Sequence, residues 1–430
     1  MASYKTSIFL MSCVFVFGAQ DASWSNPNQI NSGYWALHIP FDLEPFETLG
    51  GRSLGMGNAF IAIADDSTAA VINPAGLTEI QRMEFTADLR YSSYKTDYLD
   101  TYTASNNVGL GPDLEEIGTF DNDITDFSFI GLTLPLVSGR MAASLYYKNS
   151  SFEAADVQDV GPVSILDETL NLQQQNISRK EIDEYQKGVF GLAGAVNYDG
   201  FFSVGATVNL EQLNAGLSEQ WTSNDFSNNT LEATTEYENR IEGDDTDITF
   251  AIGALYKPVQ GISIGVSYRK GANFSIAYTS TETICDPLSV CDRISEDDNV
   301  TFDIPDVWGA GIAWKTLDGW LFSAQVDMVE YSALQDSTTE GITMDETIDD
   351  GLIFRFGVEK SFYRANSSQY QLRAGMFSVP DHDGFQAIDS DRMYYTLGGG
   401  VTLSKQIELN VGTSFSEDMI DTLLSFSYNF

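Results

Sequence analysis

The sequence predicts an all-β protein, a 14-stranded antiparallel transmembrane β-barrel. Three observations indicate this fold. The chain of 430 residues contains fourteen segments in which apolar and polar residues alternate with the period of a β-strand. Short turns and long polar segments connect these strands in turn, as at the two ends of an outer-membrane barrel. The chain also begins with residues typical of an export signal.

The first residues have the composition of a secretory signal peptide. One lysine precedes an apolar stretch over 8–17, and small residues follow it. We expect a signal peptide at 1–19, with cleavage near Ala19 or Ala22. A lipoprotein cleavage site at Cys13 is a second interpretation, which the apolar residues beyond that cysteine disfavour.

A segment of a different kind precedes the first strand. Residues 50–77 read GGRSLGMGNAFIAIADDSTAAVINPAGL, which is rich in glycine and small residues and does not alternate. Asp65 and Asp66 are suited to cap a short helical turn over 69–71. Pro74 then ends the turn, because the residue before a proline disfavours the helical conformation.

The strands follow one another from residue 82 onward. Residues 422–430, TLLSFSYNF, place leucine, phenylalanine and tyrosine on one face and serine and asparagine on the other. Backbone groups in lipid must be paired, and a closed barrel pairs them without leaving an edge. The expected strands lie at 82–96, 124–137, 139–154, 184–198, 200–221, 241–257, 260–281, 302–315, 318–331, 351–361, 368–378, 391–404, 405–415 and 420–430.

The connections alternate between short and long. Tight turns are expected at 136–139, 198–200, 258–260 and 317–319, and long polar loops at 97–123, 155–183, 222–240, 282–301 and 332–350. We expect the tight turns to face the periplasm. The alternative is a secreted, soluble β-sandwich or propeller, whose strands also alternate. The asymmetry of the loops and the lack of a blade-length repeat favour the membrane barrel.

The chain is strongly acidic. It has 62 acidic and 22 basic residues and a formal net charge of −40, which disfavours nucleic acid as a partner. The acidic loops either keep the protein soluble or bind cations. Cys285 and Cys291 flank a short proline-containing loop, and in an oxidising compartment this spacing predicts a disulfide.

The segment at 50–77 resembles the N-terminal hatch of the outer-membrane long-chain fatty-acid transporters, the FadL family. In that hatch an Asn-Pro-Ala motif follows an Ala-Asp-Asp segment. The later segments GALYKPVQGISIGVSYR, IPDVWGAGIAWK, GWLFSAQVDMVEYSAL, LRAGMFSVPD and DRMYYTLGGGV also resemble that family, in the same order along the chain. Barrels that serve as shuttle or anchor proteins in a secretion system carry a similar hatch motif.

The resemblance implies a plugged barrel in the outer membrane of a Gram-negative bacterium. Residues 20–80 would form the N-terminal extension and luminal hatch, and 81–430 the barrel. It implies passive transport of long-chain fatty acids or other hydrophobic molecules, hydrocarbons and aromatics included, with lateral exit through a kinked early strand. The implied hatch or gating residues are Gly55, Gly57, Asp65, Asp66, Asn73, Pro74 and Ala75, and the candidates for the strand kink are Gly131 and Pro135.

Other expected partners are outer-membrane lipids and the barrel assembly machinery, which would meet the C-terminal strand ending in Phe430. In the family a basic residue meets the fatty-acid carboxylate. The corresponding candidates are Arg52, Arg140 and Arg355, although each is also suited to pair with a carboxylate of the protein itself.

We expect no cofactor, metal or catalytic site. His38 and His382 have no serine or cysteine partner in a recognisable motif, and Asp381, Asp383 and Gly384 only faintly suggest a calcium loop. Two functions compete with transport: a scaffold that binds secreted proteins, and an outer-membrane enzyme such as a lipid hydrolase. Large apolar side chains beside the hatch would favour the transporter, whereas a charged lumen would favour the scaffold.

Overall fold

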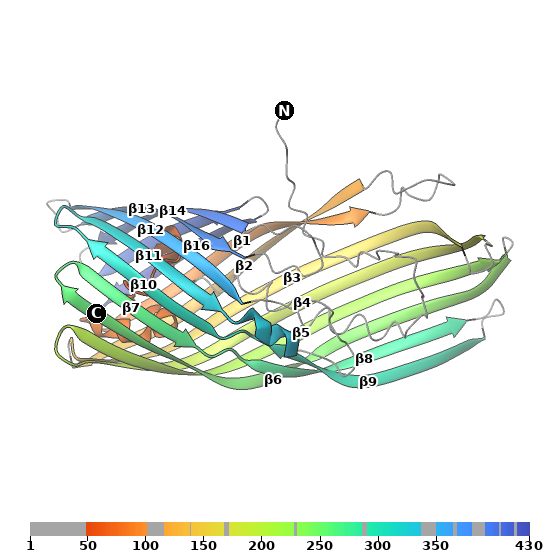
Figure 1. Ribbon diagram of the computed structural model, residues 1–430, viewed down its shortest axis with the longest axis horizontal. Helices are drawn as coiled ribbons and strands as arrows, with labels where there is room; N and C mark the ends of the chain where they lie inside the picture. Colours follow the sequence, from red (N-terminus) through yellow and green to blue (C-terminus); the bar gives the residue numbers. More distant parts are fainter. Residues whose placement is uncertain are drawn as a thin grey trace, which may run out of the picture.

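The chain folds into a closed β-barrel with short helices inside it, as the computed structural model shows (Figure 1). The structure describes residues 49–100, 116–137, 139–166, 172–227, 230–285, 290–336, 350–363, 368–380, 392–403, 406–416 and 419–430. The predicted signal peptide and residues 20–48 of the predicted extension lie outside this set.

Of the sixteen strands described, fourteen close the barrel, as the sequence predicts. Neighbouring strands are antiparallel, and the ring closes where Glu84 of β1 pairs with Asn429 of β16. The barrel strands are β1 (Glu84–Asp100), β2 (Glu116–Val137), β3 (Met141–Leu166), β4 (Leu172–Asn197), β5 (Phe202–Ser227), β6 (Thr230–Val259), β7 (Ile262–Arg269), β10 (Val307–Lys315), β11 (Trp320–Val329), β12 (Gly351–Tyr363), β13 (Gln369–Val379), β14 (Arg392–Leu403), β15 (Ile407–Phe415) and β16 (Met419–Asn429).

The outer face of the barrel is an apolar band. Along β4, Leu192 is 63% exposed whereas its neighbour Ala193 is 3% exposed, and the other strands repeat this alternation. Such a surface is unfavourable in water and suited to lipid. Trp314 lies at one edge of the band and Trp308 at the other, where aromatic rings mark the interfaces of a membrane protein.

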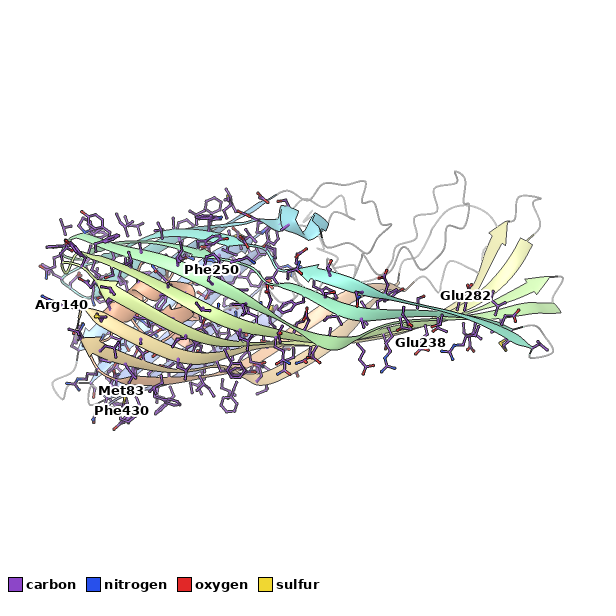
Figure 2. All side chains as sticks on the ribbon, turned by 90° about the horizontal axis from the view of Figure 1, so that it is seen from below. Met83, Arg140, Glu238, Phe250, Glu282 and Phe430 are labelled. Carbon is purple, nitrogen blue, oxygen red and sulfur yellow. A yellow bond between two sulfur atoms is a disulfide. The ribbon has the colours of Figure 1, made fainter. Side chains whose placement is uncertain are left out.

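The end of the barrel with the tight turns is called the turn end here. Figure 2 shows Met83, Arg140 and Phe430 gathered at this end, and the Phe430 N–H donates to the carbonyl of Met83 at 2.9 Å. Gly200 has a φ of 84° in the turn between β4 and β5, a left-handed conformation that favours glycine.

At the opposite end, β3 to β6 continue as a sheet well beyond the barrel (Figures 1 and 2). The long loops predicted at 155–183 and 222–240 are therefore wrong for most of their length, because strands β3 to β6 run through them. Outside the membrane a strand needs no apolar face, so its backbone pairing leaves little pattern in the sequence. We call this sheet the extension.

A hairpin of β8 (Asn273–Cys285) and β9 (Cys291–Asp303) completes the extension by pairing with the outer half of β6. The single strands predicted at 260–281 and 302–315 are therefore wrong. The first is broken between β7 and β8 at 270–272, and the second between β9 and β10 at 304–306. A side chain at Gly271 would approach the carbonyl oxygen of Ile304 to 1.7 Å, so the two breaks fit together only with glycine there.

The hatch, Leu49–Ile80, fills the barrel near the turn end. It contains α2 (Gly51–Gly55), α3 (Ala69–Ile72) and the 3-10 helix η2 (Pro74–Glu79); a second 3-10 helix, η4 (Tyr331–Asp336), follows β11. Among the described residues, no helix has the length and apolar character to cross a membrane. The apolar side chains of the hatch pack against those of the wall, such as Phe129 and Tyr146.

Candidate functional site

The hatch motif Asn73-Pro74-Ala75 is buried against strands β5 and β6. The side chain of Asn73 donates from Nδ2 to the carbonyls of Ile61 (2.9 Å) and Ala254 (3.2 Å). Its Oδ1 accepts from the backbone N–H of Ala75 at 3.2 Å and so caps η2. One amide therefore joins two parts of the hatch to the wall.

The wall leaves room for this motif by having glycine on its inner face. A Cβ at Gly205 would lie 2.4 Å from the backbone of Pro74, and one at Gly253 would lie 2.0 Å from Oδ1 of Asn73. Gly57 of the hatch makes the reverse approach, because its Cβ would lie 2.5 Å from the carbonyl of Phe356. Hatch and wall thus touch backbone to backbone, which only glycine permits.

Gly55 makes a similar contact, because a Cβ on this residue would lie 3.0 Å from Cα of Gly398. Polar side chains of the wall also accept hydrogen bonds from N–H groups of the hatch. The acceptors of these bonds are Asp88 for Gly50, Ser425 for Gly51, Thr396 for Gly57, Gln325 for Phe60 and Ile61, and Glu84 for Ser67.

An ion network, buried except at Asp65, fastens the other side of the hatch. Arg52 contacts Asp65 (2.5 Å) and Glu359 (3.0 Å), and Glu359 also accepts from Arg373 (2.8 Å). Burial works against the charge of Arg52, but the carboxylates of Asp65 and Glu359 outweigh it and hold the pKa of Arg52 well above its ordinary value. Arg52 is therefore a fastener of the hatch.

Asp66 lies beside this network. Burial and the neighbouring carboxylate of Asp65 raise the pKa of Asp66 to about 6, although its hydrogen bond with Thr68 opposes the shift. The backbone N–H of Thr68 donates to Oδ1 of Asp66 at 3.0 Å, which closes the turn that leads into α3.

The kink candidates both lie on β2. Gly131 is in regular register with Tyr146 of β3, and its missing side chain makes room for the ring of Phe129, which would lie 2.7 Å from a Cβ. Pro135 adjoins a register shift between Pro135 and Val137. A second shift lies opposite Asp88 and Leu89 of β1. The pairing of β2 with β3 ends at Phe129 and Lys148.

A cavity of about 130 Å³ lies between the hatch and the wall and is here called the main cavity. Eleven of its nineteen lining residues are apolar, and Leu49, Ile61 and Ile72 from the hatch face Ile353 and Phe377 from the wall. The other eight are polar or charged. Phe377 also belongs to a buried apolar cluster that continues toward the extension and includes Phe274, Ile276, Val300 and Phe302. Packed apolar side chains thus continue beyond the cavity itself.

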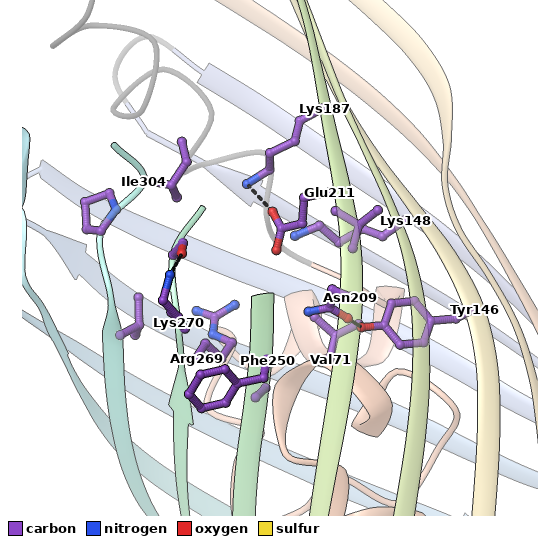
Figure 3. Close-up of a pocket in the computed structure, with 15 residues that line it drawn as sticks. Val71, Tyr146, Lys148, Lys187, Asn209, Glu211, Phe250, Arg269, Lys270 and Ile304 are labelled. Carbon is purple, nitrogen blue, oxygen red and sulfur yellow. Dashed lines mark hydrogen bonds and ion pairs between the residues drawn. The ribbon is translucent and has the colours of Figure 1, made fainter. Parts of the chain in front are cut away.

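A smaller cavity of about 50 Å³, the side cavity, lies next to it (Figure 3). Lys187 and Arg269 line both cavities, so the two are neighbours. Lys148 and Lys270 also line the side cavity, against one carboxylate, that of Glu211. Nζ of Lys187 lies 3.9 Å from Oε2 of Glu211.

Four cationic side chains therefore surround a space inside a protein of net charge −40. Among the described residues that line this space, the carboxylate comes from Glu211. Lys187 is 2% exposed and Lys148 is 5% exposed, so water screens them little. The side cavity is therefore suited to hold the anionic group of a molecule whose apolar part lies in the main cavity.

Of the three arginines considered from the sequence, Arg355 lines the main cavity, and its Nε is paired with Asp327 at 2.6 Å. Arg52 fastens the hatch, and Arg140 lies exposed at the turn end. The sequence reasoning missed Lys148 and Lys187. Strand period could have indicated them, because in 186–196 the residues in phase with Lys187 face the lumen and Phe190 and Leu192 face outward.

Cys285 and Cys291 are joined by a disulfide near the tip of the β8–β9 hairpin. His38, His382, Asp381, Asp383 and Gly384 lie outside the described residues. Within the described part of the chain, no group of three or more histidine, cysteine or acidic side chains is arranged to hold a metal ion.

Solved structures share this architecture. The toluene transporter TodX of P. putida is 13% identical, with a TM-score of 0.62 over 90% of this chain and 99% of that one. A FadL homologue of Pseudomonas aeruginosa is 14% identical, with a TM-score of 0.59 over 89% and 98% of the two chains. The Ralstonia pickettii toluene transporter TbuX is 15% identical, with a TM-score of 0.52 over 91% and 100%.

At these identities the likeness establishes the fold. No curated protein sequence matches the chain. A family model described as outer membrane protein transport protein (OMPP1/FadL/TodX) matches residues 187–419, which is more than half of the sequence. The chain therefore belongs to the OMPP1/FadL/TodX family of outer-membrane transport proteins of Gram-negative bacteria.

Proposed function

We propose that the protein is a passive channel for small hydrophobic molecules, which bind in the main and side cavities before they pass the hatch. The observation that carries this proposal is the apolar lining of the main cavity next to the hatch, continued by the apolar cluster that includes Phe274 and Phe302. An apolar solute gains about 25 cal/mol for each Å² that it removes from water, so such a lining concentrates it.

The volume limits what fits in the closed state. A cavity of about 150 Å³ lined by leucine, isoleucine and phenylalanine is enough to bind benzene. The main cavity, at about 130 Å³, therefore suits one aromatic ring or a short piece of an alkyl chain. Two of the similar structures are named as toluene transporters, which supports a ligand of this size. A long-chain fatty acid would extend from it into the apolar cluster.

The cations of the side cavity favour a ligand with one anionic group. We infer a carboxylate that lies near Lys187 and Arg269, with its apolar body in the main cavity. Fatty acids and aromatic acids both have this form. A neutral hydrocarbon would use the main cavity alone.

We propose that the hatch residues Asn73, Pro74 and Ala75, together with Gly55 and Gly57, control the passage, and that the turn end faces the periplasm. For release sideways into the membrane, the seam between β2 and β3 is the route implied by the resemblance. The end of their pairing at Phe129 and the register shift beside Pro135 support a weak seam there. We also propose that the strand ending in Phe430 is recognised by the barrel assembly machinery.

The test compares a charged and an uncharged form of one ligand. Purified protein in nanodiscs is titrated with the fluorescent polyene cis-parinaric acid and with its methyl ester. Lys187→Gln should weaken binding of the acid about tenfold, which corresponds to about 1.4 kcal/mol, and change binding of the ester less than about twofold. Lys315→Gln removes the same charge at an exposed position outside both cavities and should change neither.

Failure of both probes to bind, together with a secreted protein retained on the purified barrel, would replace the channel by the scaffold function. Equal losses of affinity for the acid and for the ester would contradict the contact between Lys187 and an anionic group of the ligand. The apolar main cavity would then remain as the binding site.

A further inference from the structure

The two edges of the apolar band differ in the charged groups that lie beside their aromatic rings. At the edge near the extension, Trp308 donates from Nε1 to Glu330 at 2.9 Å, and the hydroxyl of Tyr268 donates to Asp306. Both rings there have a carboxylate as partner. At the turn end, the exposed charged residues include three cations, Arg82, Arg140 and Lys315. The band therefore meets a different electrostatic surface at each end.

Arg140 lies in the tight turn between β2 and β3, just past the apolar band, with its side chain exposed (Figure 2). Its N–H donates to the carbonyl of Val137 at 2.8 Å, and its carbonyl accepts from the N–H of Asn197 at 2.8 Å. These two bonds hold the turn against the end of β4 through the backbone alone. Within the described residues no carboxylate pairs with the guanidinium. Its five N–H donors therefore face outward from a fixed turn.

The carboxylate of the adjoining turn is held by its own backbone. Asp199 lies between β4 and β5, and its Oδ1 accepts from the N–H groups of Phe201 at 3.0 Å and Phe202 at 3.1 Å. A side chain that caps its own turn in this way fixes the loop. Asp199 thus shapes the surface beside Arg140 without forming an ion pair with that arginine.

Apolar and aromatic side chains surround Arg140 on the outer face of the barrel. Met141 of β3 and Val196 of β4 are register partners, and both are exposed. Phe202 of β5 and Tyr256 of β6 form a second exposed pair. Aromatic rings at the end of an apolar band mark the level of the lipid headgroups. Arg140 therefore stands where the acyl chains of a lipid end and its phosphate begins.

A second cation lies on the other side of the turn end, on β12. Nζ of Lys360 is 4.8 Å from the ring centre of Trp320, and Trp320 and Trp314 both stack on Phe322, at 6.0 and 5.7 Å. The same Nζ donates to the carbonyl of Asp318 at 2.7 Å and lies 3.9 Å from its carboxylate. Lys360 is thus partly neutralised, so Arg140 offers the stronger site for an anion.

Charge complementarity indicates which lipid suits this surface. A guanidinium can bind two phosphate oxygens at once, which an ammonium cannot do. The whole protein has a net charge of −40, so an anionic headgroup is repelled unless local cations hold it. The turn end supplies such cations beside apolar side chains, and the opposite edge of the band supplies carboxylates.

We propose that Arg140 binds the phosphate of an anionic phospholipid in the membrane leaflet at the turn end, with the acyl chains of the lipid against Met141 and Val196. Lys360 on Trp320 forms a second, weaker site. In the orientation proposed above, this leaflet faces the periplasm. The lipid lies on the outer face of the barrel and outside both cavities, so its binding is separate from that of a transported molecule.

The test counts bound lipids by native mass spectrometry. The purified protein in detergent is titrated with phosphatidylglycerol and with phosphatidylcholine of the same acyl chains, whose choline cation cancels the phosphate charge. The parent should bind phosphatidylglycerol more tightly. Arg140→Gln should weaken its tightest binding about fivefold and change that of phosphatidylcholine less than about twofold, because a basic residue at a membrane surface attracts anionic lipid.

Two further variants separate charge from place. Arg240→Gln removes the same charge from an exposed pair in the extension and should leave both affinities unchanged. Arg140→Lys keeps the charge but not the two-oxygen contact, so its affinity for phosphatidylglycerol should lie between those of the parent and Arg140→Gln. Resistance of each variant to SDS on unheated gels shows that the barrel is folded.

An Arg140→Gln protein that binds phosphatidylglycerol as tightly as the parent would overturn the site. A parent that binds the two lipids equally would overturn it as well, because the headgroup charge would then not be recognised. If Arg140→Gln does not fold, the parent is titrated at increasing concentrations of ammonium acetate. Salt should weaken the binding of phosphatidylglycerol alone, and an affinity that does not change with salt would contradict the proposal.

Discussion

Asn73 of the hatch donates a hydrogen bond from Nδ2 to the backbone carbonyl of Ala254 in β6, at 3.2 Å. The same nitrogen donates to Ile61 within the hatch at 2.9 Å. One buried amide therefore holds the hatch together and holds it to the wall. The Asn-Pro-Ala motif thus lies at the point where the hatch is both folded and attached to the wall.

Replacing Asn73 should loosen the hatch. Asn73→Ala leaves buried polar groups without a partner, at a cost of about 1–3 kcal/mol for each such group. Amide hydrogen exchange in 60–80 should rise about tenfold or more, with little change in the barrel strands. Asn299→Ala, at an exposed position on the hairpin, is the control. Unchanged exchange in the hatch would show that Asn73 does not fasten it.

The wall glycines should tolerate no side chain. Gly205→Ala or Gly253→Ala would place a methyl group against Pro74 or Asn73, and overpacking of this kind costs about 1–3 kcal/mol. We expect faster proteolysis of the hatch in both variants. Gly194→Ala on β4 is the matched control, because a Cβ there meets nothing within 4 Å. Equal proteolysis of all three variants would contradict the close approach.

Glu359 should be indispensable to the ion network. It lies between Arg52 and Arg373, so Glu359→Gln leaves two buried cations without their shared carboxylate. Breaking a buried ion pair in this way costs about 3–5 kcal/mol. The folded barrel should then lose its resistance to SDS at a lower temperature on gels. Glu242→Gln, in an exposed pair with Arg240, should leave that temperature unchanged; a similar shift in both would refute the role of burial.

The hatch should become less stable as pH rises toward 6. The pKa of Asp66 is about 6 in the folded protein and 3.8 as the reference, so the folded state binds this proton more tightly than the unfolded state. This tighter proton binding stabilises the folded state below pH 4. The stabilisation is lost as the pH rises through about 6, the pKa of Asp66 in the folded protein. Other carboxylates titrate too. The quantity to measure is therefore the free energy of unfolding of the parent protein minus that of Asp66→Asn.

This difference in the free energy of unfolding should fall between about pH 4 and pH 6 and stay level above that range. Asp65→Asn removes the neighbouring charge and should move the fall to lower pH. A difference that does not vary with pH would mean that Asp66 ionises as an ordinary carboxylate.

The sequence was informative wherever a segment faces lipid. Residues 422–430 alternate because one side of β16 meets the membrane and the other meets the lumen, so the period identifies both the strand and its faces. The same signal fades in the extension, where the outer half of β6 pairs with β5 and β8. For this reason the predicted loop at 222–240 is wrong and the break at 270–272 was missed.

The cavity residues show the same limit. Lys187 is one of 22 basic residues. The period of its strand predicts that its side chain points into the barrel, but it does not predict which residues surround that side chain. Lys148, Arg269 and Lys270 come from strands β3, β7 and the break that follows β7, which meet Lys187 only when the barrel closes around the hatch. Gly205 and Gly253 likewise look like ordinary strand glycines until Asn73 and Pro74 lie against them.

Periodicity and the Asn-Pro-Ala motif are local properties of the chain, so they are enough to predict the barrel, its number of strands, the separate segment at 50–77 and the family resemblance. Folding is needed to show where the hatch touches the wall, which cations surround the cavities, and that β6 exchanges β7 for β8 beside Phe250. These features depend on contacts between residues far apart in sequence. Only closure of the barrel, which fixes the register of every strand at once, brings those residues together.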